Sequence, residues 1–485
     1  MRWQDSDGDL QRRNEYLDGK EDRVIWRVQL TGAYSSGLAY SPRHGEYVAM
    51  YTRHLYRALQ TALEDTRVVL LNGARQTGKS TLARQVAEER GGQYLTLDDP
   101  ATRALATSDP AALIKTGAAF TVIDEVQYAP ALFPAIKRAV DTDPRPGRFL
   151  LTGSANVFLV PKLAESLAGR MEILPLHPLS QAEMGDSDLN IVDRLFDALG
   201  WRTVTLPINR IDVANRIVAG GFPEAVTRSP GERRDAWFRS YVASILQRDI
   251  RDLAHIEGLN DIPRLLSLLA ARPSALMNMS EVSRASGIPH STLRRYLSLL
   301  EATFLLQPLP AWSTNIGKRL VKSPKIHLLD TGLTAHLAGF TDTDALTRAP
   351  ALGPMLESFV VQEIRKHLAW SRQQATAWHY RSAAGQEVDL VLEAPGQRIV
   401  GIEIKATANI GTGDFSGLRA LADTGGEKFV CGVLFYLGEN VLPFGNKLWA
   451  VPVSALWQKP AGQDRFGIRR KPSPPGSLDF AGIQT

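Results

Sequence analysis

One short stretch, Gly73 to Ser80, constrains the fold of this chain more than any other. It reads GARQTGKS and matches G-x-x-x-x-G-K-[ST]. The apolar run 68–71 precedes it and helix-forming residues 81–87 follow, so a strand, a loop and a helix are predicted in that order. Glycines at both ends let the backbone bend, and successive N–H groups then form a phosphate-binding hollow. A Gly-rich turn before an ordinary helix is the alternative, but the flanking strand and helix favour the phosphate loop.

The residue types within this loop predict how a nucleoside triphosphate is held. Lys79 can reach the β- and γ-phosphates, and the Ser80 hydroxyl can bind Mg²⁺. Arg75 contacts the nucleotide or only braces the loop. The predicted ATP-binding residues here are Gly73, Ala74, Arg75, Gln76, Thr77, Gly78, Lys79, Ser80 and Thr81.

A second apolar strand, Phe120 to Ile123, ends in the carboxylates Asp124 and Glu125. Asp124 is predicted to hold Mg²⁺ together with Ser80. Glu125 is predicted to orient and activate the attacking water, with Lys79 as the other catalytic residue of the loop. A strand that ends in Asp-Glu is common by chance, but its position after a phosphate loop favours the functional interpretation.

A further strand, 148–152, is followed by Gly-Ser-Ala-Asn. In the additional-strand class of P-loop ATPases, such a strand lies between the two strands already described. Ser154 or Asn156 would then sense the γ-phosphate by hydrogen bonding, although both also suit a plain turn. Arg170 is a candidate arginine finger, in cis or across an oligomer, and an ordinary surface arginine is the alternative.

These motifs together resemble a known family. The segments GARQTGKSTLARQ, VIDEVQYAP, LLTGSAN and SLAGR, followed by LPLHPLS at 174–180 and GGFPEA at 220–225, look like a prokaryotic AAA-type ATPase. In that family an ATPase domain precedes a C-terminal domain of unknown function. The resemblance runs from about Met50 to about Leu456 and implies ATP binding and hydrolysis by an ASCE-class P-loop domain. The first 49 residues have no counterpart there.

Composition sets broader limits. The 485 residues are too many for one core, and 44% hydrophobic with 22% charged residues suits a soluble globular protein. No apolar run is long enough to cross a bilayer, and the single cysteine, Cys431, excludes an internal disulfide, so a cytoplasmic protein is expected. A net charge of +5 permits nucleic-acid contact without arguing strongly for it.

Residues 279–300 predict two short helices joined by a turn. Ser280 can cap the first helix, Gly287-Ile288-Pro289 makes the turn, and His290 or Ser291 begins the second helix. This is the helix-turn-helix pattern.

Two strands after these helices extend the pattern to a winged helix. The first is 304–309, and the basic run KRLVKSPKIHLLD at 318–330 supplies a turn and a second strand. Arg294, Arg295 and the basic residues of the wing suit phosphate contacts with DNA. A lid or protein-contact module is the competing interpretation.

The last part of the chain carries its own group of charged residues. Strands are predicted at 377–381, 387–392 and 400–405. Alternation places Glu403 and Lys405 on one face, with Asp389 across a hairpin. Two converging carboxylates can hold Mg²⁺, and a nearby lysine can orient water.

This arrangement resembles the restriction-endonuclease-like PD-(D/E)XK fold. Glu357, in the helical run 354–364, could add a ligand or a supporting contact. The family's proline before the aspartate is absent, because Val388 stands there. A metal-binding nuclease centre made of Glu357, Asp389, Glu403 and Lys405 and an inactive fold that binds nucleic acid or protein both remain open.

We therefore predict an α/β multidomain protein: a P-loop ASCE-type parallel-sheet ATPase, a helical and winged-helix region, and a restriction-endonuclease-like α/β domain. The predicted segments are a flexible N-terminal extension at 1–49, from an over-early start codon or as a docking arm, the ATPase domain at 50–228, the helical linker and winged helix at 229–345, the nuclease-like domain at 346–458 and a disordered tail at 459–485.

Two functions follow from this organisation, both using ATP and Mg²⁺. In the first, ATP hydrolysis is coupled to action on nucleic acid through the winged-helix and nuclease-like domains. In the second, the protein is a nucleotide-dependent switch that binds a protein or DNA partner and does not cut. Homo-oligomer formation is left open, and no membrane contact is expected.

Overall fold

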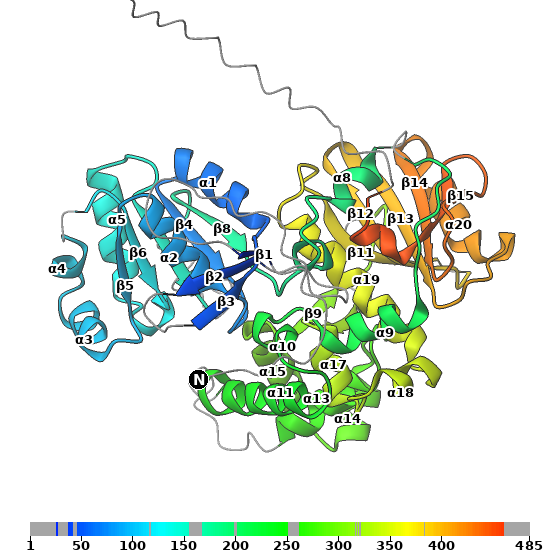
Figure 1. Cartoon of the computed structure of the whole chain (residues 1–485), viewed down its shortest axis with the longest axis horizontal. Helices are drawn as coiled ribbons and strands as arrows, with labels where there is room; N and C mark the ends of the chain where they lie inside the picture. The colour runs from blue at the N-terminus through cyan, green and yellow to red at the C-terminus, as the bar shows by residue number, and fades with distance from the viewer. Residues whose placement is uncertain are drawn as a thin grey trace, which may run out of the picture.

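The computed structural model describes residues 51–115, 118–154, 167–197, 201–250, 261–315, 317, 319, 322–382 and 384–459, and the backbone of three short strands before them. Figure 1 shows three parts: a parallel-sheet domain in blue and cyan, a helical part in green, and a second sheet domain in yellow to red. The long helix α19 (Leu352–Leu368) lies where the second and third parts meet.

The first domain is built on a five-stranded sheet in the order β5-β6-β7-β4-β8. The strands are β4 (Val68–Asn72), β5 (Gln93–Thr96), β6 (Thr121–Asp124), β7 (Phe149–Gly153) and β8 (Met171–Pro175), and every neighbouring pair is parallel. Strand β7 lies between β4, which leads into the phosphate loop, and β6, which ends in Asp124. This order confirms the predicted additional strand.

Helices cover this sheet because their apolar residues recur on one side. In α1 (Leu55–Asp65), the buried residues are Leu55, Leu59, Ala62 and Leu63, which is the spacing of one helical face. The other helices and turns of the domain are α2 (Lys79–Glu89), α3 (Pro100–Ser108), α4 (Pro110–Ile114), η1 (Val126–Tyr128) and α5 (Leu132–Thr142). Residues of β4 are buried along the whole strand, as expected for the centre of a parallel sheet.

The segment that follows β8 leaves this domain. After α7 (Gln181–Met184), the helices α8 (Ile191–Phe196) and α9 (Arg210–Ala219) bury apolar residues in the same core as the C-terminal sheet. The structure therefore differs from the predicted boundary at residue 228, because packing divides the chain before α8. The motif GGFPEA, which lies after α9, does not indicate whether α8 and α9 pack with the ATPase sheet or with the C-terminal sheet.

The middle part is helical and has a core of its own. Its elements are α10 (Pro223–Val226), α11 (Glu232–Ile245), the π-helical turn η3 (Leu246–Ile250), α13 (Ile262–Ala270), α14 (Met279–Ser286), α15 (His290–Ala302), β9 (Leu306–Leu309), β10 (Lys325–Leu328) and α17 (Thr331–Leu337). Helix α18 (Thr343–Arg348) follows, and its buried residue Leu346 lies in the core of the C-terminal sheet. The two predicted helices are present as α14 and α15, and β9 pairs antiparallel with β10. The winged-helix assignment itself stays a prediction.

The third domain contains a mixed six-stranded sheet in the order β11-β12-β13-β14-β16-β15. Its strands are β11 (Thr376–Arg381), β12 (Glu387–Ala394), β13 (Arg398–Lys405), β14 (Phe429–Tyr436), β15 (Leu442–Pro443) and β16 (Leu448–Pro452). Helix α19 packs on one face, and α20 (Ser416–Gly425) packs on the other. Short turns η5 (Pro395–Gln397), η6 (Thr412–Phe415), η7 (Gly426–Lys428) and η8 (Val453–Leu456) connect the elements.

The ends of the chain are only partly described. Strands β1 (Trp26–Arg27), β2 (Gly37–Ser41) and β3 (Glu46–Met50) form a small antiparallel sheet within the predicted extension. The rest of residues 1–49 and the predicted tail beyond Lys459 lie outside the described residues, so flexibility there stays a prediction. Over the part of the chain that the structure describes, no helix has the length and apolar character needed to span a bilayer.

Candidate functional site

The loop between β4 and α2 requires glycine at two positions. A Cβ on Gly73 would lie 2.2 Å from the carbonyl oxygen of Leu176, so no larger residue fits. Gly78 has a φ of 92° and directly precedes α2, in the left-handed region that glycine enters at little cost. Gln76 also has a positive φ, of 60°, which is uncommon for a residue with a side chain.

The loop lysine is drawn into the hollow of the loop. Lys79 is buried, and its Nζ donates a hydrogen bond to the carbonyl oxygen of Ala74 at 2.8 Å. The hydroxyl of Thr77 donates to the same carbonyl at 3.0 Å. The ammonium group therefore already lies inside the curve of the loop, where a phosphate chain would meet it.

The predicted Mg²⁺ ligands lie together at the carboxyl edge of the sheet. The Ser80 hydroxyl donates to Oδ1 of Asp124 at 3.0 Å. Thr152 donates to the same oxygen at 2.5 Å, and the Tyr94 hydroxyl donates to Oδ2 at 2.7 Å. Burial and this bond to Asp124 raise the pKa of Tyr94 well above its ordinary value. Thr152 and Tyr94 were not predicted, although Thr152 is a polar residue in an otherwise apolar strand.

Glu125 is held in an unusual backbone conformation. Its φ is 59°, in the left-handed region that costs a residue with a side chain roughly 1–2 kcal/mol. Its N–H donates to the hydroxyl of Thr152 at 3.0 Å. The side-chain amide of Gln127 donates to Oε2 of Glu125 at 2.5 Å and to the Ser154 hydroxyl at 2.9 Å. Gln127 thus joins the predicted catalytic carboxylate to the predicted sensor, and no sequence signal identified it.

The other three residues predicted for this site, Arg75, Asn156 and Arg170, lie in different places relative to the loop or outside the described residues. Arg75 donates to the hydroxyl of Tyr128 at 2.7 Å, which braces the loop against η1. Asn156 lies outside the described residues. Arg170 pairs with Asp141 at 2.5 Å and precedes β8 at the amino edge of the sheet, opposite to the phosphate loop. This position disagrees with a finger in cis, and a role across an oligomer stays a prediction.

An arginine that the sequence did not single out supports the loop from outside. Arg53 donates to the carbonyl oxygens of Thr77 at 2.6 Å and His177 at 2.7 Å, and its Nε lies 3.0 Å from Oε1 of Glu183. Burial alone would raise the pKa of Glu183, but Arg53, His54 and two backbone N–H groups bring it down to about 2. The loop is therefore tied to the start of α7.

The middle part also contacts the loop. Ala74 is buried in the same apolar cluster as Phe222, Trp237 and Tyr241. The Tyr241 hydroxyl lies 3.5 Å from the carbonyl oxygen of Arg75. A movement of the loop backbone would therefore change the packing of α11.

The second predicted group of residues meets in the C-terminal domain, and we call it the acid centre: Glu357, Asp389, Glu403 and Lys405. Lys405 Nζ lies 2.9 Å from Oε1 of Glu403, as the alternation in β13 predicts. Oδ2 of Asp389 accepts the N–H of Ile404 at 3.0 Å. The residue missed by the sequence analysis is Lys325, whose Nζ lies 2.6 Å from Glu357 and 2.9 Å from Asp389.

Burial perturbs the charges of the acid centre. Burial and the neighbouring Asp389 raise the pKa of Glu357 to about 8 and that of Glu403 to about 7. Oε2 of Glu403 has no hydrogen-bond partner, and the residue is 8% exposed. Among the described residues, no three His, Cys, Asp or Glu side chains stand ready as a metal-ion cage.

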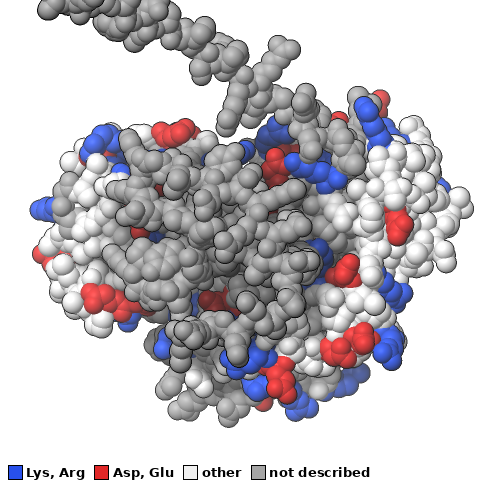
Figure 2. All heavy atoms as spheres, in the orientation of Figure 1, with Lys and Arg blue, Asp and Glu red and all other residues white. Residues whose placement is uncertain are grey.

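The basic residues predicted to contact DNA divide into two sets. Arg294 and Arg295 are exposed, as are His290 and Ser291 beside them at the start of α15. In contrast, the described basic residues Arg319, Lys322 and Lys325 all contact the C-terminal domain. The sequence predicted that these basic residues are exposed for contact with DNA phosphates, whereas in the structure they contact the protein itself. Figure 2 shows basic and acidic side chains interspersed over the described part of the face it presents.

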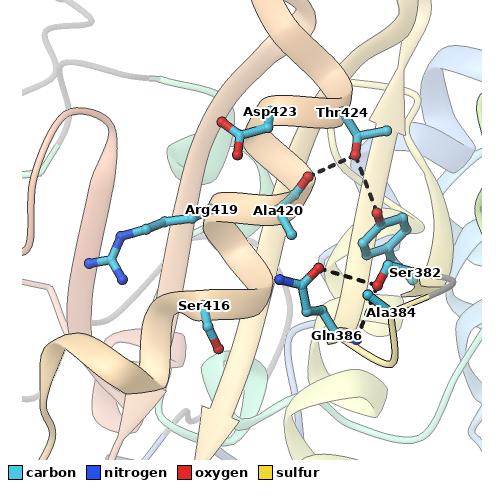
Figure 3. A pocket seen from close by; sticks show the side chains of 9 residues that line it. Ser382, Ala384, Gln386, Ser416, Arg419, Ala420, Asp423 and Thr424 are labelled. Carbon is cyan, nitrogen blue, oxygen red and sulfur yellow. Dashed lines mark hydrogen bonds between the residues drawn. The ribbon is translucent and has the colours of Figure 1, made fainter.

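A separate cavity of about 540 Å³ lies in the C-terminal domain between α20 and the β11–β12 hairpin. Figure 3 shows Ser416, Arg419 and Asp423 on the helix and Ser382 and Gln386 on the hairpin, and all five line the cavity. The Tyr380 hydroxyl lies 3.2 Å from that of Thr424 across it. Neither the loop nor the acid centre lines this cavity.

Three family matches cover most of the described chain. Residues 65–185 match the AAA domain family. Residues 210–344 match a domain of unknown function (DUF8612), and residues 352–456 match another (DUF4143).

Curated relatives extend over most of the chain. The uncharacterized proteins Mb2031c of Mycobacterium bovis and Rv2008c of Mycobacterium tuberculosis are each 33% identical over 400 residues, which is 82% of this chain and 82% of the relative. An uncharacterized protein of Haemophilus influenzae is 25% identical over 233 residues, 45% of this chain and 52% of its own length.

Solved structures give a weaker likeness. The Thermotoga maritima RuvB Holliday junction branch migration motor is 18% identical, and the match covers 53% of this chain and 89% of that one, with a TM-score of 0.27. A mutant of the same protein matches with the same values. A TM-score this low does not establish a shared fold. The fold of the first domain is assigned from its strand order and from the match to the AAA domain family.

Proposed function

This chain belongs to the family of proteins that includes Rv2008c of Mycobacterium tuberculosis and contains an AAA domain, and we propose that it binds ATP and hydrolyses it at the loop Gly73 to Ser80. One observation carries this proposal: the Ser80 hydroxyl lies 3.0 Å from Asp124, beside the loop lysine and directly before Glu125. A binding loop alone would not need the two carboxylates at its edge.

The side chains divide the work of hydrolysis. The N–H groups of the loop and Lys79 bind the phosphates and offset the charge that develops on the transferred phosphoryl group. Glu125 orients the attacking water and accepts its proton. Gln127 fixes Glu125 relative to Ser154, which senses the γ-phosphate. Helix α11, whose Tyr241 hydroxyl lies 3.5 Å from the carbonyl oxygen of Arg75, transmits a movement of the loop to the middle part.

Mg²⁺ fits the donor set beside the loop. Ser80 and Asp124 supply the hydroxyl and carboxylate oxygens that this ion prefers, on neighbouring elements. They would hold the ion with the phosphates, and the ion would supply additional positive charge there. The bond from Thr152 to Asp124 keeps the carboxylate turned toward Ser80.

Two substitutions test this proposal. Lys79→Ala should abolish hydrolysis and weaken nucleotide binding, because it removes the phosphate-binding ammonium. Glu125→Gln should keep nucleotide binding and stop turnover, because the amide cannot accept the proton. Steady-state phosphate release and fluorescent-nucleotide titration measure the two effects. A Glu125→Gln variant that hydrolyses ATP at the wild-type rate would exclude Glu125 as the water-activating residue.

A second candidate function concerns the acid centre, which we propose acts on nucleic acid. Two observations favour it: Asp389 accepts the N–H of Ile404, which lies between Glu403 and Lys405, and Lys325 lies between Asp389 and Glu357 of α19. The alternative is a nucleotide-dependent switch that binds a protein or DNA partner without cutting, alone or as a homo-oligomer in which Arg170 acts across subunits.

The combined Asp389→Ala and Lys405→Ala variant separates these alternatives. Loss of cation-dependent DNA or RNA cleavage, with ATP hydrolysis intact, would support action of the acid centre. The intact ATPase rate is the folding control. If the wild-type protein cuts neither DNA nor RNA with ATP and Mg²⁺, the cutting hypothesis is excluded and the switch remains.

A further inference from the structure

The wing, which we define as β9, β10 and the described residues between them, lies against the C-terminal domain. Arg319 makes two bonds to Glu393 of β12, at 2.6 and 3.0 Å. Lys322 donates to the carbonyl oxygen of Arg381 at 3.0 Å. The ring Nε2 of His379 donates to the carbonyl oxygen of Ser323 at 3.0 Å. These contacts fasten the wing over the β11–β12 hairpin.

Lys325 extends this contact into the acid centre. It lies at the start of β10, its side chain is 7% exposed, and its ammonium lies within 3 Å of both Glu357 and Asp389. A buried ammonium between two carboxylates occupies the position in which oxygen ligands would surround a cation. The unpartnered Oε2 of Glu403 shows that this centre has capacity for one further positive or donor group.

We propose that Lys325 closes the acid centre, and that a divalent cation binds to Glu357, Asp389 and Glu403 only when the wing withdraws this ammonium. Three carboxyl groups share the centre with Lys405 and Lys325. Withdrawal of Lys325 would remove the ammonium that lies 2.9 Å from the largely buried Asp389 and 2.6 Å from Glu357, and burial of an unpaired carboxylate is costly unless a cation takes the place of the ammonium. Oxygen ligands select hard cations such as Mg²⁺ or Mn²⁺.

Closure by the wing accounts for two features together. Lys325 contacts Glu357 and Asp389, and Lys405 contacts Glu403, while no ready metal cage is present among the described residues. The described basic residues of the wing, Arg319, Lys322 and Lys325, contact the C-terminal domain, whereas the helix-turn-helix pattern alone would leave them exposed. A nuclease-like centre that opens only on movement of the preceding part would be protected from unselective action.

This inference rests on the second proposed function in one respect: both take the carboxylates of the acid centre as ligands of a cation. Binding of Mn²⁺ to the full chain without nucleotide, measured by the loss of the free Mn²⁺ electron paramagnetic resonance signal, is independent of cleavage. Lys325→Met should bind one additional Mn²⁺ at least about tenfold more tightly than the wild type. Lys322→Met removes a nearby cation of the wing that donates to the carbonyl oxygen of Arg381, and this variant should bind Mn²⁺ as the wild type does.

Adding Asp389→Asn to Lys325→Met should abolish the additional binding, since Asp389 is the carboxylate that Lys325 shares with Glu357. If Lys325→Met is folded and binds Mn²⁺ no better than Lys322→Met, closure by Lys325 is refuted. If Lys325→Met unfolds in EDTA, Mn²⁺ should restore the fold, because binding to the folded state adds stability. Failure of Mn²⁺ to restore it would also refute the inference, whereas absent cleavage would count only against the nuclease function.

Discussion

Thr152 is the residue whose replacement tests the candidate ATP site most directly. It is fully buried in β7, its hydroxyl donates to Asp124 at 2.5 Å, and it accepts the N–H of Glu125 at 3.0 Å. Thr152→Val keeps the shape and removes both bonds. An unpaired buried N–H costs about 1–3 kcal/mol, and a lost bond to a carboxylate about 1.5–3 kcal/mol.

Because one hydroxyl makes both bonds, the two costs overlap, and we expect a local destabilisation of about 2–4 kcal/mol. Hydrogen exchange of peptides that contain β6 and β7 measures this change as an opening equilibrium. About 2 kcal/mol corresponds to roughly thirtyfold faster exchange. ATP turnover should fall at least about tenfold, because Asp124 and Glu125 both lose their alignment.

Thr121→Val is the matched control. Thr121 is also buried, but it lies at the opposite end of β6 from Asp124. It should leave ATP turnover within about twofold of the wild type. If Thr152→Val exchanges and hydrolyses ATP as the Thr121→Val control does, the alignment of Asp124 and Glu125 does not depend on this hydroxyl, and the reasoning fails.

Two further predictions concern the loop and its support. Gly73→Ala should abolish nucleotide binding in fluorescence titrations, because its Cβ would lie 2.2 Å from the carbonyl oxygen of Leu176. Gly353→Ala is the control, since Gly353 has open space around it and no positive φ, and this variant should bind nucleotide normally. The pKa of Glu183 is about 2 in the fold against an ordinary 4.5, so its stabilising contribution is present above pH 4.5 and is lost as the pH falls through 2. In Glu183→Gln, the free energy of unfolding should therefore decrease less steeply between pH 4.5 and pH 2 than in the wild type. An unchanged pH dependence in acid unfolding would contradict the ion pair with Arg53.

The parts of the candidate site that the sequence predicted are those carried by short contiguous motifs. The glycines, lysine and serine of the loop, and the carboxylates after β6, are positioned by one strand, one turn and one helix. Gln127, Tyr94 and Arg53 escaped prediction because their roles depend on contacts between elements that are far apart in the chain. Arg170 was predicted from its local motif, but the sheet places it at the edge opposite to the loop.

The sequence by itself determined the phosphate loop, the order of strands and helices around it, and the alternation that puts Glu403 beside Lys405. These are consequences of local backbone geometry, which a few neighbouring residues control. Only the tertiary structure decided that α8 and α9 join the C-terminal core, and that Lys325 enters the acid centre. Both depend on which surfaces meet, and burial against a distant partner leaves no periodic signal in the chain. Two residues of the basic stretch that the sequence assigns to phosphate contacts, Arg319 and Lys325, are paired in the folded chain with the protein's own carboxylates.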